Sequence, residues 1–197
     1  MPAVKDALFA ATPSHASDPW FPLRVAYGRA ERTLAIKQFL DDRQVETFLP
    51  MTHKRVLIDG RRRIKLVPAI DNLLFVHAPE AWLKEAKRTC EPLLPLRFLM
   101  WHPHDALQTS HIISVTPRDM SNFMRVAAID DDRVMFLGNK DFTGKIGRRV
   151  RVVAGLFKGV EGTIYRVKKD RRVVVTLDGV CSVAISCMNP DYLEEID

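Results

Sequence analysis

Residues 147–179 read GRRVRVVAGLFKGVEGTIYRVKKDRRVVVTLDG and decide the fold of the carboxyl-terminal part of the chain. Short runs rich in valine alternate apolar with polar residues, and glycines, Lys-Asp or Asp-Gly pairs separate the runs. Five such runs lie between Arg148 and Ile196, at the spacing of roughly 8 to 12 residues typical of small barrels. The segment therefore predicts a five-stranded β-barrel whose glycines serve turns, because no Gly-Lys-Ser/Thr follows them as in a phosphate loop.

The chain upstream of this barrel has a different organisation. Residues 1–19 show no sustained period and predict a loosely ordered leader. Residues 20–129 alternate strand and helix patterns in the order β-α-β-β-α-β-α, which predicts an antiparallel sheet covered by helices. Residues 130–146 combine consecutive acids with glycines and predict a linker, so that the barrel domain occupies 147–197. The fold class is α+β.

The elements expected in residues 20–129 follow from periodicity and turn residues. They are a strand at 20–27, an amphipathic helix at 29–43, a hairpin of strands 45–58 and 61–67 turning at Asp59-Gly60, an inner strand at 73–76, a helix opening at Pro79-Glu80, a strand at 96–101 and a helix opening at Thr116-Pro117.

Basic residues gather in two places. The hairpin is the densest basic cluster and has one acid, Asp59; its cations are Lys54, Arg55, Arg61, Arg62, Arg63 and Lys65. Clustered cations gain from displacing counterions around phosphates, so nucleic acid is the predicted partner, with a merely solvated hairpin tip as the alternative. The second place is the start of the first helix, where Arg29 and Arg32 lie near Tyr27, whose ring could stack on an unpaired base. The alternative is that the two arginines belong to an ordinary charged helix face.

Composition limits the remaining function classes. The 197 residues hold 30 Lys and Arg against 24 Asp and Glu, a formal charge of +6 that suits an anionic partner. No run approaches the roughly 18 apolar residues of a membrane span, and no signal peptide is recognisable, so a soluble cytoplasmic protein is expected. Cys90, Cys181 and Cys187 show no paired spacing and are expected as buried small hydrophobes.

Catalytic and metal-binding patterns are weak. His102, His104 and His111 are the densest potential metal ligands, but their spacing matches no metal signature. No local motif places a nucleophile beside a base. We therefore expect neither an enzyme nor a metal or other cofactor.

The barrel segment resembles a KOW motif, in which an apolar strand runs into a Gly-x-Phe-x-Gly-x-x-Gly turn and a second strand. The matching residues are Val150, Val152, Gly155, Phe157, Gly159, Gly162, Ile164 and Val167. Upstream, Trp20-Phe21, the helix after Gly28, Phe48-Leu49-Pro50 and the strand at 73–76 resemble the amino-terminal domain of NusG transcription elongation factors. The two resemblances occur in the family's order and span nearly the whole chain.

The resemblance implies a monomeric factor that binds RNA polymerase during elongation and suppresses pausing and termination. The clamp helices of the largest subunit would contact Trp20, Phe21, Leu73, Phe75 and Phe98, although Phe75 could equally be core. The non-template DNA strand would meet Tyr27, Arg29 and Arg32, and the loop with Phe157 and Lys158 would recruit a ribosomal protein or the termination factor Rho. A general elongation factor and a KOW-bearing protein that binds ribosomal RNA remain the alternatives.

Two departures resemble specialised paralogs of the RfaH kind, which serve long polysaccharide operons. General members of the family usually have Phe-Pro-Gly-Tyr where this chain has Ile70-Asp71-Asn72-Leu73, and the chain carries the leader before Trp20. Specialised members act against termination, so Rho is the less expected partner of this barrel. The valine-rich runs favour a stable barrel over one that changes fold.

Overall fold

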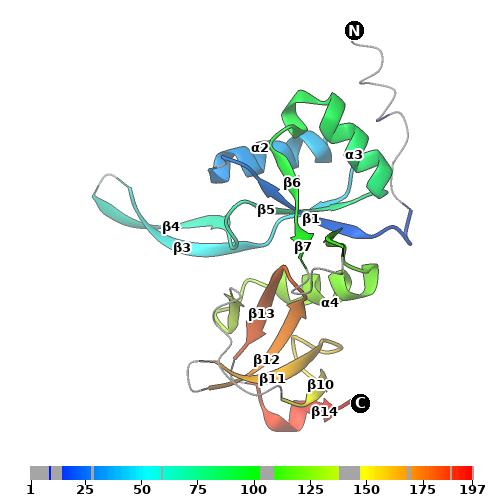
Figure 1. The fold of residues 1–197 in the computed structure, drawn as a ribbon. Helices are drawn as coiled ribbons and strands as arrows, with labels where there is room; N and C mark the ends of the chain where they lie inside the picture. The colour runs from blue at the N-terminus through cyan, green and yellow to red at the C-terminus, as the bar shows by residue number, and fades with distance from the viewer. Residues whose placement is uncertain are drawn as a thin grey trace. The chain divides into compact units, whose positions relative to one another are not determined.

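The computed structural model divides the chain into two compact units, Met1–Pro117 and Arg118–Asp197, each described here by itself (Figure 1). The described residues are 9, 15–27, 29–58, 60–102, 109–137, 147–167, 170–186 and 188–196, without the side chains of 58 and 167. Most of the predicted leader and the second half of the predicted linker lie outside these residues.

Unit 1 is built on a four-stranded sheet with the order β2-β5-β1-β6. Its strands are β1 (Trp20–Val25), β2 (Thr47–Phe48), β5 (Leu73–His77) and β6 (Leu96–Phe98), and every neighbouring pair is antiparallel. The predicted strand at 20–27 ends at Val25, because Tyr27 takes a positive φ of 52° that an extended strand cannot hold.

Helices α2 (Ala30–Asp41) and α3 (Glu80–Thr89) and the short 3-10 helix η1 (Glu91–Leu93) complete the core of unit 1. Figure 1 shows α2 and α3 beside the sheet. The core joins apolar residues of both helices to alternate residues of the strands; its members include Phe21, Leu23, Val25, Ile36, Leu40, Leu74, Val76, Leu83 and Leu96. This arrangement confirms the predicted α+β class.

Two small hairpins extend unit 1. Strands β3 (Met51–Ile58) and β4 (Arg61–Pro68) pair over their whole lengths and form a separate two-stranded sheet, called the arm below (Figure 1). Gly60 has φ of +73° in the turn between them, as the Asp-Gly pair predicted. Strands β7 (Met100–Trp101) and β8 (His111–Ile112) form the second hairpin.

Unit 2 holds a six-stranded antiparallel sheet with the order β14-β10-β11-β12-β13-β9. The strands are β9 (Val134–Leu137), β10 (Arg149–Val152), β11 (Glu161–Val167), β12 (Asp170–Leu177), β13 (Cys181–Ile185) and β14 (Leu193–Glu195), with a 3-10 helix η2 (Pro190–Tyr192) before the last. Helix α4 (Pro117–Ala127) opens the unit.

The units divide at a different place from the composition break. Helix α4, expected in the first domain, falls in unit 2 except for Pro117, and β9 occupies part of the expected linker 130–146. The reason is pairing at a distance: β9 adds to β13 with Phe136 opposite Val183, and Leu137 enters a small core with Val174 and Ala184. The sequence analysis missed β9 because its apolar run, Val134–Leu137, has only four residues and follows shortly after three acids.

Candidate binding surfaces

The five side chains predicted to bind RNA polymerase do not share one face of the sheet. Successive side chains of a strand point to opposite faces, so Phe21 of β1 and Leu74 and Val76 of β5 face the helices. Trp20, Leu73 and Phe75 occupy the intervening positions and face the other way. We call this second side, with Pro22 and Phe48, the outer face of the sheet.

Phe21 and Phe98 belong to the helix-facing core. Phe21 is 1% exposed, and Phe98 packs against the core with its ring 5.7 Å from that of Phe21. The Lys87 ammonium lies 4.0 Å from the centroid of the Phe98 ring. Burial, and secondly the charge of Arg97, lowers the pKa of Lys87. Phe21 is thus part of the core of unit 1, whereas Phe98 lies at its edge and is partly exposed; their predicted contact with RNA polymerase stays a prediction.

The outer face is mostly apolar and buried, with the exposed Arg24 opposite Leu73 at one end and His77 opposite Trp20 at the other. Trp20, Leu73 and Phe75 are each at most 3% exposed. The Trp20 ring stacks on His77 at 4.8 Å, and Phe75 lies 6.4 Å from Phe48 between ring centroids. Strand β5 is therefore apolar and buried on both sides, which is typical of a sheet with a layer on each face.

His77, at the end of β5, links the outer face of the sheet to the residues that precede β1. Its Nδ1 lies 2.7 Å from Oε2 of Glu46, and its Nε2 lies 2.9 Å from the carbonyl oxygen of Asp18. Both ring nitrogens have partners, and the ring is stacked, so His77 is a structural residue that orders the entry to β1. The sequence analysis missed it because its partners lie 31 and 59 residues away.

Tyr27 stands out at the end of β1. Its side chain is 97% exposed, and its backbone is in the left-handed region, which a bulky residue rarely adopts. Arg29 and Arg32 are exposed at the start of α2, and Nη1 of Arg32 donates to the Tyr27 carbonyl oxygen at 3.4 Å. The structure thus brings together the three predicted residues: a free ring and two cations near one turn.

The three arginines of the arm are exposed but do not act as one group. Arg61 and Arg63 lie on one side of β4 and Arg62 on the other, because side chains alternate along a strand. The sequence analysis treated the three arginines as one group, because a run of arginines does not show which side of the strand each side chain occupies.

The predicted partner loop of unit 2 presents its lysine and not its phenylalanine. Phe157 is 2% exposed, with the Arg133 guanidinium 5.2 Å from its ring, whereas Lys158 is exposed. Gly155 and Gly159 have φ of +78° and +85°, as the turn required. A Cβ at Gly159 would lie 2.7 Å from Nη1 of Arg125 on α4.

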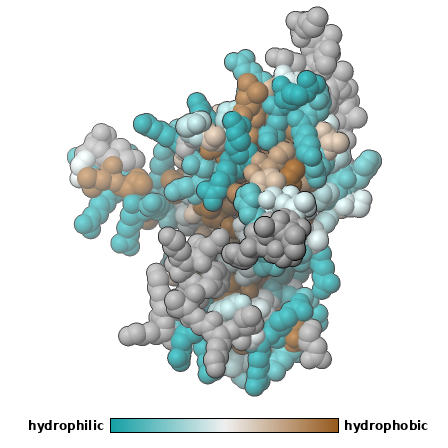
Figure 2. Space-filling model, in the orientation of Figure 1, coloured by the Kyte–Doolittle hydropathy of each residue, from teal (hydrophilic) through white to brown (hydrophobic). Residues whose placement is uncertain are grey.

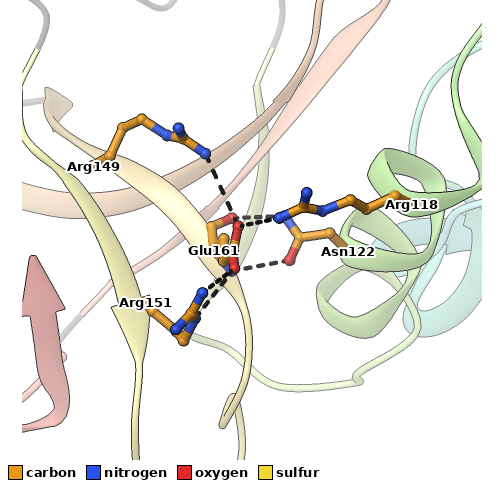
Figure 3. A network of polar contacts seen from close by, with 5 residues as sticks. All are labelled: Arg118, Asn122, Arg149, Arg151 and Glu161. Atoms are coloured by element: carbon orange, nitrogen blue, oxygen red, sulfur yellow. Dashed lines mark hydrogen bonds and ion pairs between the residues drawn. The ribbon is translucent and has the colours of Figure 1, made fainter. Parts of the chain in front are cut away.

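A polar network attaches α4 to β11 (Figure 3). The Asn122 side-chain amide pairs with the backbone of Glu161: Nδ2 donates to the carbonyl oxygen at 2.6 Å, and Oδ1 accepts from the N–H at 2.9 Å. The Glu161 carboxylate pairs with Arg118, Arg149 and Arg151. These arginines, chiefly Arg151 by its hydrogen bonds, lower the pKa of Glu161.

The residues weighed for metal or nucleophile chemistry remain scattered where they are described. His102 Nδ1 lies 2.9 Å from Ser110 Oγ, and His111 stacks on Trp101 at 4.9 Å, while His104 is outside the described residues. Within the described ranges no three His, Cys, Asp or Glu side chains form a group that could hold a metal ion. Cys90 and Cys181 are free and buried, as expected, and Cys187 is not described.

Comparisons with known proteins add little to this geometry. No protein-family model matches the chain, and no curated protein matches it. Among solved structures the chain is similar to one titled "Domain interaction in Thermotoga maritima NusG", with a TM-score of 0.43 and 14% identity over 93% of this chain and 100% of that one. A superposition this loose transfers no residue roles, so the proposals below rest on the side chains described above.

No helix in the described part of the chain is long and apolar enough to cross a membrane. The single described residue among the first 14, Phe9, lies edge-on to Phe39 of α2 at 6.1 Å and to Trp82 of α3 at 5.3 Å. The leader therefore contributes at least one side chain to the packing around both helices, which composition alone did not indicate.

Proposed function

We propose that this protein is a NusG-type transcription elongation and antitermination factor, without catalysis of its own, that binds RNA polymerase through the outer face of the unit 1 sheet. The observation that carries the proposal is that β5 is apolar on both sides although α2 and α3 fill only one. An antiparallel sheet with one covered face needs apolar residues on that face alone, so the apolar outer face needs a second covering layer. The chain itself supplies that cover here, since the outer side chains Trp20, Leu73 and Phe75 are at most 3% exposed, and in the proposal RNA polymerase takes its place.

The proposed contact uses Trp20, Leu73 and Phe75, which share the outer face, and omits Phe21 and Phe98, whose side chains lie on the opposite, helix-facing side. Because the three outer side chains are buried, a polymerase surface reaches them only after the chain that covers them moves aside. Binding then requires opening, and the affinity is reduced by the cost of that opening.

The test compares the same substitution on the two faces of the sheet. Tagged full-length chain carrying Phe75→Leu or Phe21→Leu is incubated with RNA polymerase from the organism that encodes it, and the retained polymerase is measured. Both positions are at most 1% exposed, so both variants lose stability, but only Phe75→Leu should weaken retention while the chain stays folded. Equal loss in both variants, or no loss in either, would place the contact elsewhere.

The nucleic-acid part of the proposal uses the turn after β1. Tyr27 provides a stacking surface for an unpaired base of the non-template strand, and Arg29 and Arg32 pair with its phosphates. The exposed ring and its left-handed backbone support this role, because a strained, solvated tyrosine contributes little to the fold.

Unit 2 would tether a second partner, a ribosomal protein or Rho, near the polymerase at high effective concentration. With Phe157 buried, its ring shapes the loop from inside, and the exposed Lys158 is the side chain available for contact. A ribosomal RNA-binding module is the alternative, since the single Glu161 carboxylate balances only one of the three charges of Arg118, Arg149 and Arg151.

An operon-specific role, in place of that of a general factor, is proposed from the turn before β5. Asn72 stands where general members of the family have glycine, and its φ of 58° is a conformation that glycine and asparagine adopt more readily than other residues. Asn72 thus suits this backbone conformation, while Ile70, Asp71 and Leu73 depart from the family's usual residues. Mapping the factor along the genome tests this: occupancy of a few long operons supports it, and occupancy of most transcribed genes contradicts it.

A further inference from the structure

We infer that the arm binds B-form duplex DNA through one of its two faces, the one that carries Lys54, Arg61, Arg63 and Lys65. We call this the basic face. The inference deepens the nucleic-acid contact of the proposed function and rests on it for the presence of DNA; its chemistry is argued from the arm alone.

The register of the arm sorts its side chains into two sets. Residues directly opposite each other share a face, and the pairs alternate along the ladder. The basic face begins at the pair formed by Lys54 and Lys65. Every second pair toward the turn lies on the same face, and these pairs add Arg63 and Arg61. Arg55, Leu57, Arg62, Ile64 and Leu66 fall on the reverse face.

The cations of the basic face have no acidic partners in the part of the chain that the structure describes. Like charges directly opposite on two strands repel, and Lys54 and Lys65 form such a pair. All four cations are exposed, and no acidic side chain within the described residues pairs with any of them. A row of anions at matching positions would remove the repulsion, and a phosphate backbone is such a row.

The reverse face has the wrong chemistry for phosphate. Leu57, Ile64 and Leu66 are 72%, 70% and 50% exposed, and they separate the two arginines of that side. Figure 2 shows apolar side chains along the arm with hydrophilic ones beside them. Val56 and Val67 share the basic face but are only partly exposed, so within the described residues of the arm the exposed apolar side chains lie on the reverse face, and only the basic face has exposed cations unmixed with them.

The shape of the arm selects a duplex of the B form. A two-stranded ribbon fits the B-DNA major groove, which is about 12 Å wide, whereas the deep and narrow major groove of A-form RNA excludes side chains. Eight residues in each strand extend over roughly 27 Å at 3.4 Å per residue, enough to follow phosphates along the groove. The arm is a separate two-stranded sheet that projects from unit 1, so a groove can enclose it (Figure 1).

The test is fluorescence anisotropy of full-length protein with a labelled 20-base-pair DNA duplex, with single-stranded DNA and RNA duplex of the same length as competitors, over a range of salt concentrations. The arm offers a charge-matched pair of variants: R61Q/R63Q removes two cations from the basic face, and R55Q/R62Q removes two from the reverse face. K54Q/K65Q is a second basic-face variant, and it removes the repulsion between the two paired lysines.

We expect R61Q/R63Q and K54Q/K65Q each to lower the slope of log K against log salt by about 1.8, for two lost phosphate contacts at about 0.9 each. R55Q/R62Q should leave the slope unchanged, and the DNA duplex should compete better than single strands or RNA duplex. Equal slopes in the two faces' variants, or stronger competition by RNA or single strands, would overturn the inference. No polymerase is present, so such a failure leaves the polymerase proposal standing, and that proposal is tested separately at Phe75.

Discussion

Asn72 is one of three described residues other than glycine, with Tyr27 and Gln44, that have a positive φ in unit 1. Its carbonyl oxygen accepts from the N–H of Val25, and its φ of 58° lies in the left-handed region, where a Cβ costs roughly 1–2 kcal/mol. We predict that Asn72→Ala lowers the free energy of unfolding by about 1 kcal/mol in urea titrations, while Asn72→Gly has a smaller effect. Equal effects of the two substitutions would mean that the side chain, and not the backbone, determines the cost.

Cys181 gives a second prediction at the residue scale. Burial raises the pKa of its thiol from 9.0 to about 12, so the neutral form is favoured in the folded state. The associated stability is complete below about pH 9 and is lost as the pH rises toward 12. At pH 8 we expect iodoacetamide to modify Cys181 only after denaturant is added, as measured by mass spectrometry. Modification of the native protein within minutes would contradict the burial.

Helix α4 contacts β11 through the side chain of Asn122. The Asn122 amide satisfies both backbone groups of Glu161, so Asn122→Ala leaves a part-buried donor and acceptor without partners. We predict a loss of about 1–3 kcal/mol in the unfolding of unit 2, against a small effect of the exposed Ser121→Ala on the same helix. Chemical denaturation of the two variants measures this; similar midpoints would show that α4 is held by its apolar side alone.

The Glu161 carboxylate adds a pH dependence at the same place. Its folded pKa lies below the ordinary 4.5, so its pairing stabilises the unit above about pH 4.5 and is lost as the pH falls through the folded pKa. The difference in unfolding midpoint between wild type and Glu161→Gln should therefore shrink on going from pH 7 to pH 3. If the difference in unfolding midpoint stays constant over this range, the charge of the Glu161 carboxylate is not what stabilises the unit.

The elements themselves follow largely from sequence periodicity, but their faces and partners do not. The continuous apolar run LLFV predicted β5, yet only the register with β1 shows that Leu74 and Phe75 face different layers. The apolar residues Met120 and Phe123 predicted α4, but its pairing with Glu161 joins residues 39 positions apart. Of the candidate site residues, Tyr27, Arg29 and Arg32 are exposed and lie near one turn, as their closeness in the chain indicated, and their role stays a prediction.

At the scale of the whole molecule, the division at Pro117–Arg118 predicts which fragment folds. A fragment of residues 116–197 keeps α4 and β9, whereas 147–197 loses both and leaves β13 with an unpaired edge. We expect the longer fragment to unfold in one cooperative transition by circular dichroism, and the shorter one to melt at lower temperature. A shorter fragment of equal stability would place the boundary in the composition break after all.

The central claim is that the outer face of the sheet binds RNA polymerase, and retention of polymerase by full-length Phe75→Leu against Phe21→Leu tests it most directly. The account predicts that Phe75→Leu retains several-fold less polymerase than wild type, while Phe21→Leu retains as much as wild type at a temperature where both variants are folded. Undiminished retention by folded Phe75→Leu, or absence of polymerase from the wild-type sample, would contradict it.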